Sequence, residues 1–293
     1  MLIHAGPFGN VAHANNSIIE DRVALKLADY VVTEAGFASD LGFQKFCDIV
    51  CRFGGFAPSR RRAGDDACAP RSRTAACRST SSGPRTSRRV KRGVENLGQH
   101  IAIVREYGLP CVVSINNFPS DTEAEVELMR ELAVGAGAET VVVNRGFAQG
   151  GAGAVELAEA VVAACEKPNA FHQLTPDGTP IKEQIEAIAT RVYGADGVDY
   201  QAQAEKDLAR MDQLGFGTMP VCMAKTHLSL THDPTLLNRP RGWRLPVRSV
   251  VPSAGAGFVV VLCGDMQRMP GLGRTPAYMK VDIDEQGRTI GLF

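Results

Sequence analysis

The sequence predicts an α/β fold, with a parallel sheet flanked by helices and then a smaller mixed α/β carboxyl-terminal domain. One observation is the near-continuous apolar run at residues 109–115, because strands without polar alternation are typical of parallel sheets that helices cover on both faces. A second is that such runs alternate with stretches whose apolar residues recur at helical spacing. Strands and helices that alternate in this way indicate an α/β domain.

The first elements follow from the amino-terminal residues. Apolar residues recur at helical spacing after Ser17, so we expect a helix there with Asn16 or Ser17 as its N-cap. A short strand is expected at residues 30–33, and a Gly-containing loop at 34–37.

The later elements alternate along the chain. Asp121 is expected to cap a helix whose first turns are rich in glutamate, because carboxylates suit the positive end of the helix dipole. Further helices are expected at 40–50, 94–107, 154–165, 181–193 and 201–214, and further strands at 109–115, 139–143, 219–224, 245–251, 258–263 and 278–283. We place a domain boundary near Phe171, between residues 1–170 and 171–293.

Composition argues against several classes of function. The 293 residues include 32 basic and 32 acidic side chains, and this zero net charge argues against nucleic acid or an anionic membrane as the main partner. No apolar run approaches the ~18 residues of a membrane-spanning helix, and residues 1–7 do not resemble a signal peptide, so we expect a cytoplasmic location. The eight cysteines lack metal-ligand spacing and are expected to be small buried hydrophobic residues. No metal site is therefore expected.

Residues 58–89 differ from the rest of the chain. They contain nine arginines and no leucine, isoleucine, valine, methionine or aromatic residue. Such a segment cannot build a core, so we expect it to be disordered. One interpretation is a basic arm that binds nucleic acid, and a second is a disordered linker.

A frame shift in a GC-rich gene explains this segment better. Residues 60–66, back-translated with GC-rich codons and shifted by one base, give AVVLVTT, which is the sequence of a buried parallel strand. A two-base shift of residues 74–89 permits a sequence that begins HGGVP and runs smoothly into residues 90–93. We therefore interpret residues 58–89 as a translated sequencing error or a frame-shifted pseudogene segment.

Candidate ligand-binding residues lie at three predicted strand ends, where open α/β sheets bind ligands. The ends are residues 34–37, 116–121 and 144–153, and each holds a phenylalanine among small or polar residues. Such rings could stack on a flat heterocycle, and backbone amides of the Gly-rich third end could meet anionic groups. The alternative is that each ring covers the core. His13, in the early loop, is either a catalytic base or a structural histidine.

At these motifs the chain strongly resembles the formate–tetrahydrofolate ligase family, ATP-dependent enzymes that make 10-formyltetrahydrofolate. The stretches that carry the resemblance include GPFGNVAH, ADYVVTEAGFASDLGFQKF, INNFPSDTEAE, RVYGADGVDY and SAGAGFVVVLCGDMQRMPGLGRTPA. In that combination they are specific to the family, and with further matches they span nearly the whole chain outside residues 58–89. The family has a strand, a helix and an HGGVP loop in that segment, as the shifted frames recover.

The resemblance implies a folate site at two strand ends. Phe118 and Pro119 match the family's pterin-stacking pair, and Phe147 falls where an aromatic residue closes the other face of the ring. Val143 matches an apolar contact in the same pocket. The chain departs from the family's pattern at residues 144–146, just before Phe147.

The resemblance also implies a nucleotide site. Gly9, Ala35, Gly36 and Phe37 fall where the family holds the adenine nucleotide. The neighbouring early loop departs from the family's pattern at Ala14 and Asn15, which bears on the contacts of that loop.

The resemblance covers only the carboxyl-terminal half of the family, so we expect a truncated product that is inactive alone. Residues 1–170 would be the remaining part of a P-loop NTPase-like domain that binds nucleotide and folate, and 171–293 a carboxyl-terminal domain. No catalytic residue is assigned, because the phosphate-binding groups are expected on the missing amino-terminal half. The implied substrates are formate, tetrahydrofolate and ATP with Mg²⁺, without a bound cofactor.

Full-length members of the family suggest a homotetramer. The implied reaction has two steps: ATP phosphorylates formate, and N10 of tetrahydrofolate then attacks the formyl phosphate. Two other hypotheses remain open at this point. One is a non-catalytic remnant that binds folate or nucleotide, and the other is an adaptor that binds nucleic acid through its arginine-rich run.

Overall fold

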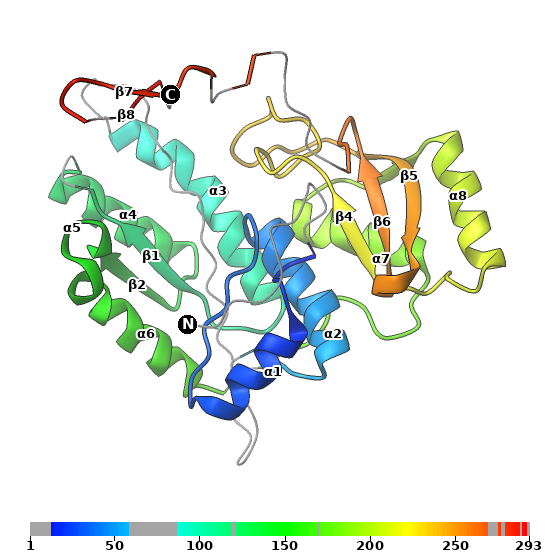
Figure 1. Cartoon of the computed structure of the whole chain (residues 1–293), viewed down its shortest axis with the longest axis horizontal. Coiled ribbons are helices and arrows are strands. Elements are labelled where there is room, and N and C mark those ends of the chain that lie inside the picture. Colours follow the sequence, from blue (N-terminus) through cyan, green and yellow to red (C-terminus); the bar gives the residue numbers. More distant parts are fainter. Residues whose placement is uncertain are drawn as a thin grey trace.

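A computed structural model describes residues 13–58, 87–118, 121–168, 170–268, 275–276, 279–287 and 289–291. The predicted α/β fold is confirmed, with parallel strand pairs flanked by helices (Figure 1). Residues 59–86 lie outside the described residues, and so does the expectation that this segment is disordered or frame-shifted. Residues 87–89 form the start of a helix.

The helices and strands follow one another in a nearly alternating order. The helical elements are α1 (Ile18–Leu27), η1 (Ser39–Phe43), η2 (Phe46–Val50), α2 (Cys51–Gly54), α3 (Ser87–Glu106), α4 (Glu123–Gly135), α5 (Gly146–Gln149), η3 (Gly150–Ala154), α6 (Val155–Cys165), α7 (Ile181–Ala187), η4 (Ile188–Tyr193), α8 (Ala202–Gln213) and η5 (Ala254–Ala256). The strands are β1 (Val112–Asn116), β2 (Thr140–Asn144), β3 (Val198–Tyr200), β4 (Val221–Ala224), β5 (Leu245–Ser253), β6 (Phe258–Cys263), β7 (Asp282–Ile283) and β8 (Thr289–Ile290).

The first sheet consists of β1 and β2, which run parallel with Val113 opposite Val141. Figure 1 shows α4 and α6 on either side of this strand pair. Both strands are rich in valine, and the middle of β2 is buried, as expected for strands covered on both faces. Because β1 and β2 are parallel, their carboxyl ends lie at the same edge of the sheet.

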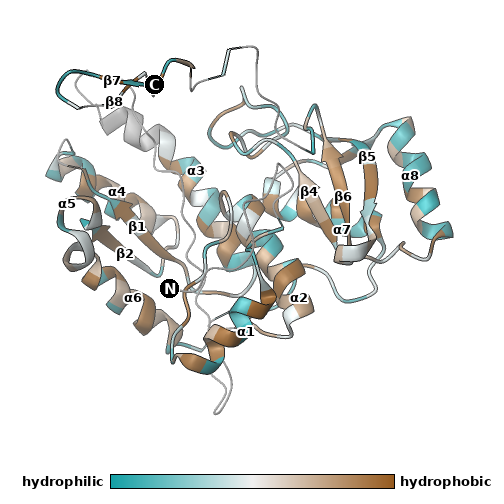
Figure 2. Ribbon diagram, viewed as in Figure 1, coloured by the Kyte–Doolittle hydropathy of each residue, from teal (hydrophilic) through white to brown (hydrophobic). Residues whose placement is uncertain are grey.

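The second sheet is mixed and has the order β3-β5-β6-β4. β3 runs parallel to β5 and β4 parallel to β6, whereas β5 and β6 are antiparallel. All residues of β4 and β6 are buried, and Figure 2 shows the apolar residues concentrated on these strands. This sheet agrees with the mixed α/β arrangement predicted after residue 170.

The chain between Ser39 and Gly54 is helical throughout and contains two π-helical stretches, η1 and η2. A π turn widens an α-helix by one residue, and such turns occur frequently at functional sites. The residues of η1 and η2 are all buried. This helix therefore lies in the interior of the protein, although the sequence alone predicts only a helix at 40–50.

Two of the local predictions are wrong. In the predicted strand at 30–33 only Val31 takes part in a bridge, and the segment joins none of the described sheets. A strand-forming sequence needs a neighbouring strand, and none of the described strands lies beside it. The N-cap of α4 is Thr122 rather than Asp121, because Thr122 and Glu125 form a capping box. The Asp121 carboxylate instead accepts a hydrogen bond from the amide of Phe118 at 2.8 Å.

Three shorter features, the cap of α1 and the strands β7 and β3, can also be compared with the prediction. Ser17 is the N-cap of α1, which confirms one of the two predicted caps. The predicted strand at 278–283 is reduced to the two residues of β7, paired with β8. β3 was not predicted, because a strand of three residues is too short to show a period.

The largest hydrophobic cluster crosses the predicted domain boundary. It joins Ile101, Tyr107 and Val113 to residues of the second sheet such as Val247 and Val259. The two parts of the chain therefore share one core, and the division near Phe171 stays a prediction.

Candidate functional site

The ends of β1 and β2 are tied together by two asparagines. Asn144 donates from Nδ2 to Oδ1 of Asn116 at 3.1 Å, and its own Oδ1 accepts a hydrogen bond from the amide of Gly146 at 2.9 Å. The amide of Asn117 donates to the carbonyl of Asn144 at 3.0 Å. Asn144 is among the residues expected to depart from the family's pattern, and these bonds give it a defined role in joining the two strand-end loops.

The structure brings two of the predicted folate residues together. The rings of Phe118 and Phe147 have centroids 5.1 Å apart and planes inclined at 56°, and their loops follow β1 and β2 (Figure 1).

 Rings at this separation touch each other, so there is no gap between them for a third ring. A planar ring sandwiched between them needs a spacing of roughly twice a stacking distance, about 7 Å, between their faces. Both rings are exposed at the surface.

The other predicted folate residues are differently placed. Val143 is buried in β2, next to the asparagine that ends the strand. Pro119 lies outside the described residues. Of the four predicted folate residues, the described part of the chain therefore places Phe118 and Phe147 in contact and Val143 in the sheet nearby.

The Gly-rich loop after β2 is folded into two short helices, α5 and η3. Its closure depends on Gly153, whose carbonyl accepts a hydrogen bond from the amide of Arg145 at 3.0 Å. A Cβ atom built on Gly153 would lie 2.5 Å from the carbonyl carbon of Arg145, whereas one on Gly151 would meet nothing within 4 Å. Gly153 is therefore required for the close approach that shapes the loop carrying Phe147.

Three of the predicted nucleotide residues, Ala35, Gly36 and Phe37, lie in the loop between the bridge residue Val31 and the helix that begins at Ser39. The amide of Gly36 donates to the carbonyl of Ala14 at 2.9 Å, and Ala14 has a φ of 97°, a conformation that favours glycine. Phe37 has a φ of 72°, and its exposed ring stacks on that of His227, with centroids 5.1 Å apart and planes inclined at 26°. The fourth predicted residue, Gly9, lies outside the described residues.

His227 was noted in the sequence only as part of a polar strand end. Its contact with Phe37 joins segments that are far apart in the chain, and no local sequence pattern predicts this contact. Two stacked, exposed rings present a flat apolar surface of the kind on which a heterocycle can stack.

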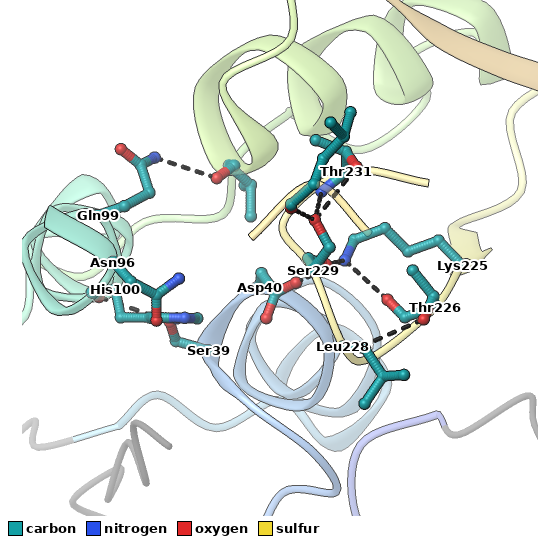
Figure 3. A network of polar contacts seen from close by, with 12 residues as sticks. Ser39, Asp40, Asn96, Gln99, His100, Lys225, Thr226, Leu228, Ser229 and Thr231 are labelled. Carbon is teal, nitrogen blue, oxygen red and sulfur yellow. Dashed lines mark hydrogen bonds and ion pairs between the residues drawn. The ribbon is translucent and has the colours of Figure 1, made fainter. Parts of the chain in front are cut away.

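A buried ion pair is formed by Asp40, which follows Phe37 closely in the sequence, and Lys225, which closely precedes His227 (Figure 3). Lys225 follows the last residue of β4, and its Nζ lies 2.7 Å from Oδ2 of Asp40. The same ammonium group donates to the carbonyls of Ser229 at 2.6 Å and Thr226 at 3.1 Å, and it lies 4.9 Å from the centroid of the Tyr193 ring. All three ammonium hydrogens thus have acceptors, as a buried lysine requires.

Neighbouring groups carry shifted pKa values. Burial is the largest single influence on the pKa of Asp40 and raises it, but the charges of Lys225 and His100 and the hydrogen bonds to the carboxylate together outweigh burial and hold this pKa below its ordinary value. Burial lowers the pKa of Lys45 and of His100, and the positive charge of Lys225 acts in the same direction on both. Ser39 Oγ lies 2.7 Å from Nδ1 of His100. The low pKa of Asp40 therefore keeps its carboxylate negatively charged beside the Lys225 ammonium group.

A second buried carboxylate, that of Asp48, lies further along the helical stretch that contains Asp40. Asp48 accepts hydrogen bonds from the Tyr107 hydroxyl at 2.6 Å, from Gln44 Nε2 at 2.9 Å and from the Leu174 amide at 2.9 Å. Burial raises the pKa of Asp48, and these hydrogen bonds oppose that shift. Asp48 therefore joins η2 to α3 and to the segment before α7. The sequence gives no signal for either carboxylate, because both lie within apolar helical patterns.

The remaining candidate groups show no further site in the described part of the chain. His13 is half-buried, and its ring centroid lies 6.1 Å from that of Phe258. The six described cysteines are buried, as predicted, and burial raises the pKa of Cys111 and Cys263 to about 12. Among the residues that the structure describes, no group of three or more histidine, cysteine, aspartate or glutamate side chains could hold a metal ion. Within the same residues, no helix has the length and apolar character needed to cross a membrane.

The fold places the chain in the class of α/β proteins, and open α/β sheets commonly bind ligands at the carboxyl ends of their parallel strands. The chain belongs to the formate–tetrahydrofolate ligase family, a family of ATP-dependent ligases, because the family model "Formate--tetrahydrofolate ligase" matches residues 1–293. The resemblance found in the sequence is thereby confirmed.

Curated relatives support this assignment. The chain is 48% identical to the formate–tetrahydrofolate ligase of Desulforamulus reducens, in a match that covers 100% of this chain and 53% of the relative. It is 46% identical to the ligase of Saccharopolyspora erythraea and 47% identical to that of Symbiobacterium thermophilum, with 100% of this chain covered in both and 53% and 52% of the relatives. The chain thus spans about half the length of the curated relatives that it matches.

The close approach at Gly153 generates a first prediction. We expect Gly153→Ala to lower the free energy of unfolding by about 1–3 kcal/mol, because the added methyl group collides with backbone atoms that cannot move independently. Gly151→Ala is the matched control in the same loop and should stay within about 0.5 kcal/mol of the original protein. Denaturant unfolding of the two variants measures both values. Equal stability of the two variants would show that the loop does not depend on this contact.

The buried ion pair generates a second prediction. Lys225→Met leaves Asp40 as an uncompensated buried charge, so it should cost about 3–5 kcal/mol of unfolding free energy. Asp40→Asn combined with Lys225→Met removes both charges, and the double variant should lose less than the sum of the single losses. Chemical denaturation of the two single variants and the double variant provides the comparison. If Lys225→Met does not fold, recovery of folding in the double variant gives the same result, whereas additive losses would contradict it.

Proposed function

We propose that this chain supplies the folate-binding and nucleotide-binding strand ends of a formate–tetrahydrofolate ligase. The enzyme joins formate to tetrahydrofolate with ATP and releases ADP, phosphate and 10-formyltetrahydrofolate. The observation that carries the proposal is the family match over residues 1–293. The two aromatic pairs support it, because the resemblance assigns both Phe118 and Phe147 of one pair, and Phe37 of the other, to a ligand.

The proposed folate site comprises Phe118, Pro119, Val143 and Phe147. In the absence of a ligand the two phenylalanine rings cover each other, and a pterin enters by separating them. Both rings are exposed, so their side chains can turn without opening the core. The hydrogen bond from the Phe118 amide to Asp121 holds the backbone of this loop while the ring moves.

The proposed nucleotide site comprises Gly9, Ala35, Gly36 and Phe37. The exposed Phe37 ring, supported by His227, offers a face for the base of the nucleotide. Mg²⁺ would arrive with the ATP phosphates as part of the substrate. In the two-step reaction, formate attacks the γ-phosphorus of ATP, and N10 of tetrahydrofolate then attacks the formyl carbon and expels phosphate.

We further propose that residues 1–170 are part of a P-loop NTPase-like domain and that 171–293 form a carboxyl-terminal domain. The groups that bind the transferred phosphate would belong to the part of the relatives that this chain does not match. The complete enzyme would be a cytoplasmic homotetramer. A second candidate function is a remnant that binds folate or nucleotide without catalysis, and the contacts at the strand ends are compatible with it.

The folate site gives a third prediction. Phe147→Ala and Phe118→Ala should each weaken tetrahydrofolate binding roughly tenfold, since each removes one aromatic face, worth about 1.4 kcal/mol. Phe53→Ala is the matched control, because Phe53 is 42% exposed and Phe118 is 41% exposed. Isothermal titration with tetrahydrofolate measures the dissociation constants. An unchanged affinity in both site variants would place the folate elsewhere.

The division of groups between the two parts of the family chain gives a fourth prediction. The purified chain should bind tetrahydrofolate but show no formate-dependent release of ADP from ATP with magnesium, because loss of each preorganised donor typically costs ~10² to 10³ in rate. The ligase of Desulforamulus reducens, assayed beside it, is the positive control. Turnover close to that of the control would mean that this chain carries its own phosphate-binding groups.

A further inference from the structure

One buried carboxylate oxygen near the proposed folate site has no donor. The Glu125 carboxylate accepts two hydrogen bonds at Oε2, from the Thr122 amide at 3.2 Å and from the Thr122 hydroxyl at 2.8 Å. Its other oxygen, Oε1, is buried and has no hydrogen-bond partner among the residues that the structure describes. Leaving a buried acceptor without a donor is unfavourable, and such an atom in a native protein normally marks a bound water, an ion or a functional contact.

Glu125 lies at the sheet edge that carries the predicted folate residues. Only residues 117–122 separate the end of β1 from the start of α4, and Phe118 is one of them. The turn is closed by two hydrogen bonds, since the Phe118 amide donates to Asp121 Oδ2 at 2.8 Å and the Asp121 amide donates to the Phe118 carbonyl at 2.9 Å. In the capping box the Glu125 side chain turns back to Thr122, the residue after this turn. The Glu125 carboxylate is therefore held beside the turn that carries the Phe118 ring.

The charges at this edge favour a ligand group that donates hydrogen bonds. The first turn of α4 contains Glu123 and Glu125, and Asp121 precedes it. The positive end of the helix dipole stabilises carboxylates there, and an ionised carboxylate can only accept hydrogen bonds. A pterin ring carries donors on one edge, the 2-amino group and N3–H. That edge is chemically complementary to an unpaired carboxylate oxygen.

We propose that Glu125 Oε1 accepts a hydrogen bond from the 2-amino group of the pterin, an assignment that rests on the folate site proposed above. Phe118 and Phe147 would stack on the faces of the ring, and faces alone do not fix how a flat ring is turned in its own plane. Glu125 supplies the contact at the ring edge that fixes this orientation. The ligand thereby gives Oε1 the donor that the described residues do not provide.

Glu125→Gln tests the contact without removing the cap, because glutamine also completes a capping box. The amide oxygen is needed at Thr122, so the amide nitrogen, a donor, takes the place of Oε1. Two donors then face each other, and tetrahydrofolate binding should weaken about tenfold or more. The variant should unfold at the same denaturant concentration as the original protein. Glu123→Gln is the matched control, because it removes the same charge from the same turn at an exposed position. It should bind tetrahydrofolate within about twofold of the original protein.

A ligand analogue separates this contact from a structural role of the carboxylate. In the analogue, hydrogen replaces the 2-amino group of tetrahydrofolate. The original protein should bind the analogue about tenfold more weakly than tetrahydrofolate, because Oε1 stays unpaired. Glu125→Gln should no longer favour tetrahydrofolate over the analogue, whereas Glu123→Gln should keep the original preference. Isothermal titration of the three proteins with both ligands measures the dissociation constants.

Three results would overturn this role of Glu125. Unchanged tetrahydrofolate affinity in Glu125→Gln would leave Oε1 to a buried water. An equal loss of affinity for both ligands would mean that the carboxylate only shapes the loop. An equal loss in Glu123→Gln would make the effect one of net charge. In each of these cases the original protein still binds tetrahydrofolate, so the proposed folate site stands. If the original protein binds neither ligand, that site is wrong and the role of Glu125 is wrong with it.

Discussion

The buried ion pair between Asp40 and Lys225 is the interaction on which the arrangement of this protein depends. Removing two charges from water costs several kcal/mol for each ion, and the cost is offset here by a short contact and by two carbonyl acceptors. The pair joins the helix that begins at Ser39 to the loop that follows β4. Phe37 lies just before that helix and His227 just after Lys225, so the ion pair fixes the two segments that carry these stacked rings.

The two candidate sites are held in place by different kinds of interaction. At β1 and β2, neutral hydrogen bonds between Asn116 and Asn144 join the loops, and the rings of Phe118 and Phe147 rest on each other at the surface. Such a site can open at low cost, because few buried contacts break when one ring turns. At the other site, charge and a left-handed backbone at Phe37 hold the ring in place. Movement is therefore easier at the predicted folate residues than at the predicted nucleotide residues.

Much of the fold could be predicted because long apolar periods dominate the local choice of structure. The helices at 181–193 and 201–214 and the strand at 258–263 have such periods and were found almost at their predicted bounds. The segment at 30–33 failed because a strand also needs a partner, which sequence pattern does not supply. The contacts of Asp40 with Lys225 and of Phe37 with His227 were not predicted, for a related reason. Each joins residues almost 200 positions apart, and single polar residues in apolar runs leave no periodic signal.

The π-helical turns between Ser39 and Gly54 have a consequence for how this chain can tolerate a change in length. Asp40 and Asp48 lie on one continuous helix and point to different partners, Lys225 and Tyr107. Each residue of a helix adds a rotation of about 100°, so a single deletion between them would turn one carboxylate away from its partner. The wider π turns set the angle around the helix axis between the side chains of Asp40 and Asp48. An insertion or deletion within this helix should therefore be tolerated less well than one in the segments on either side of it.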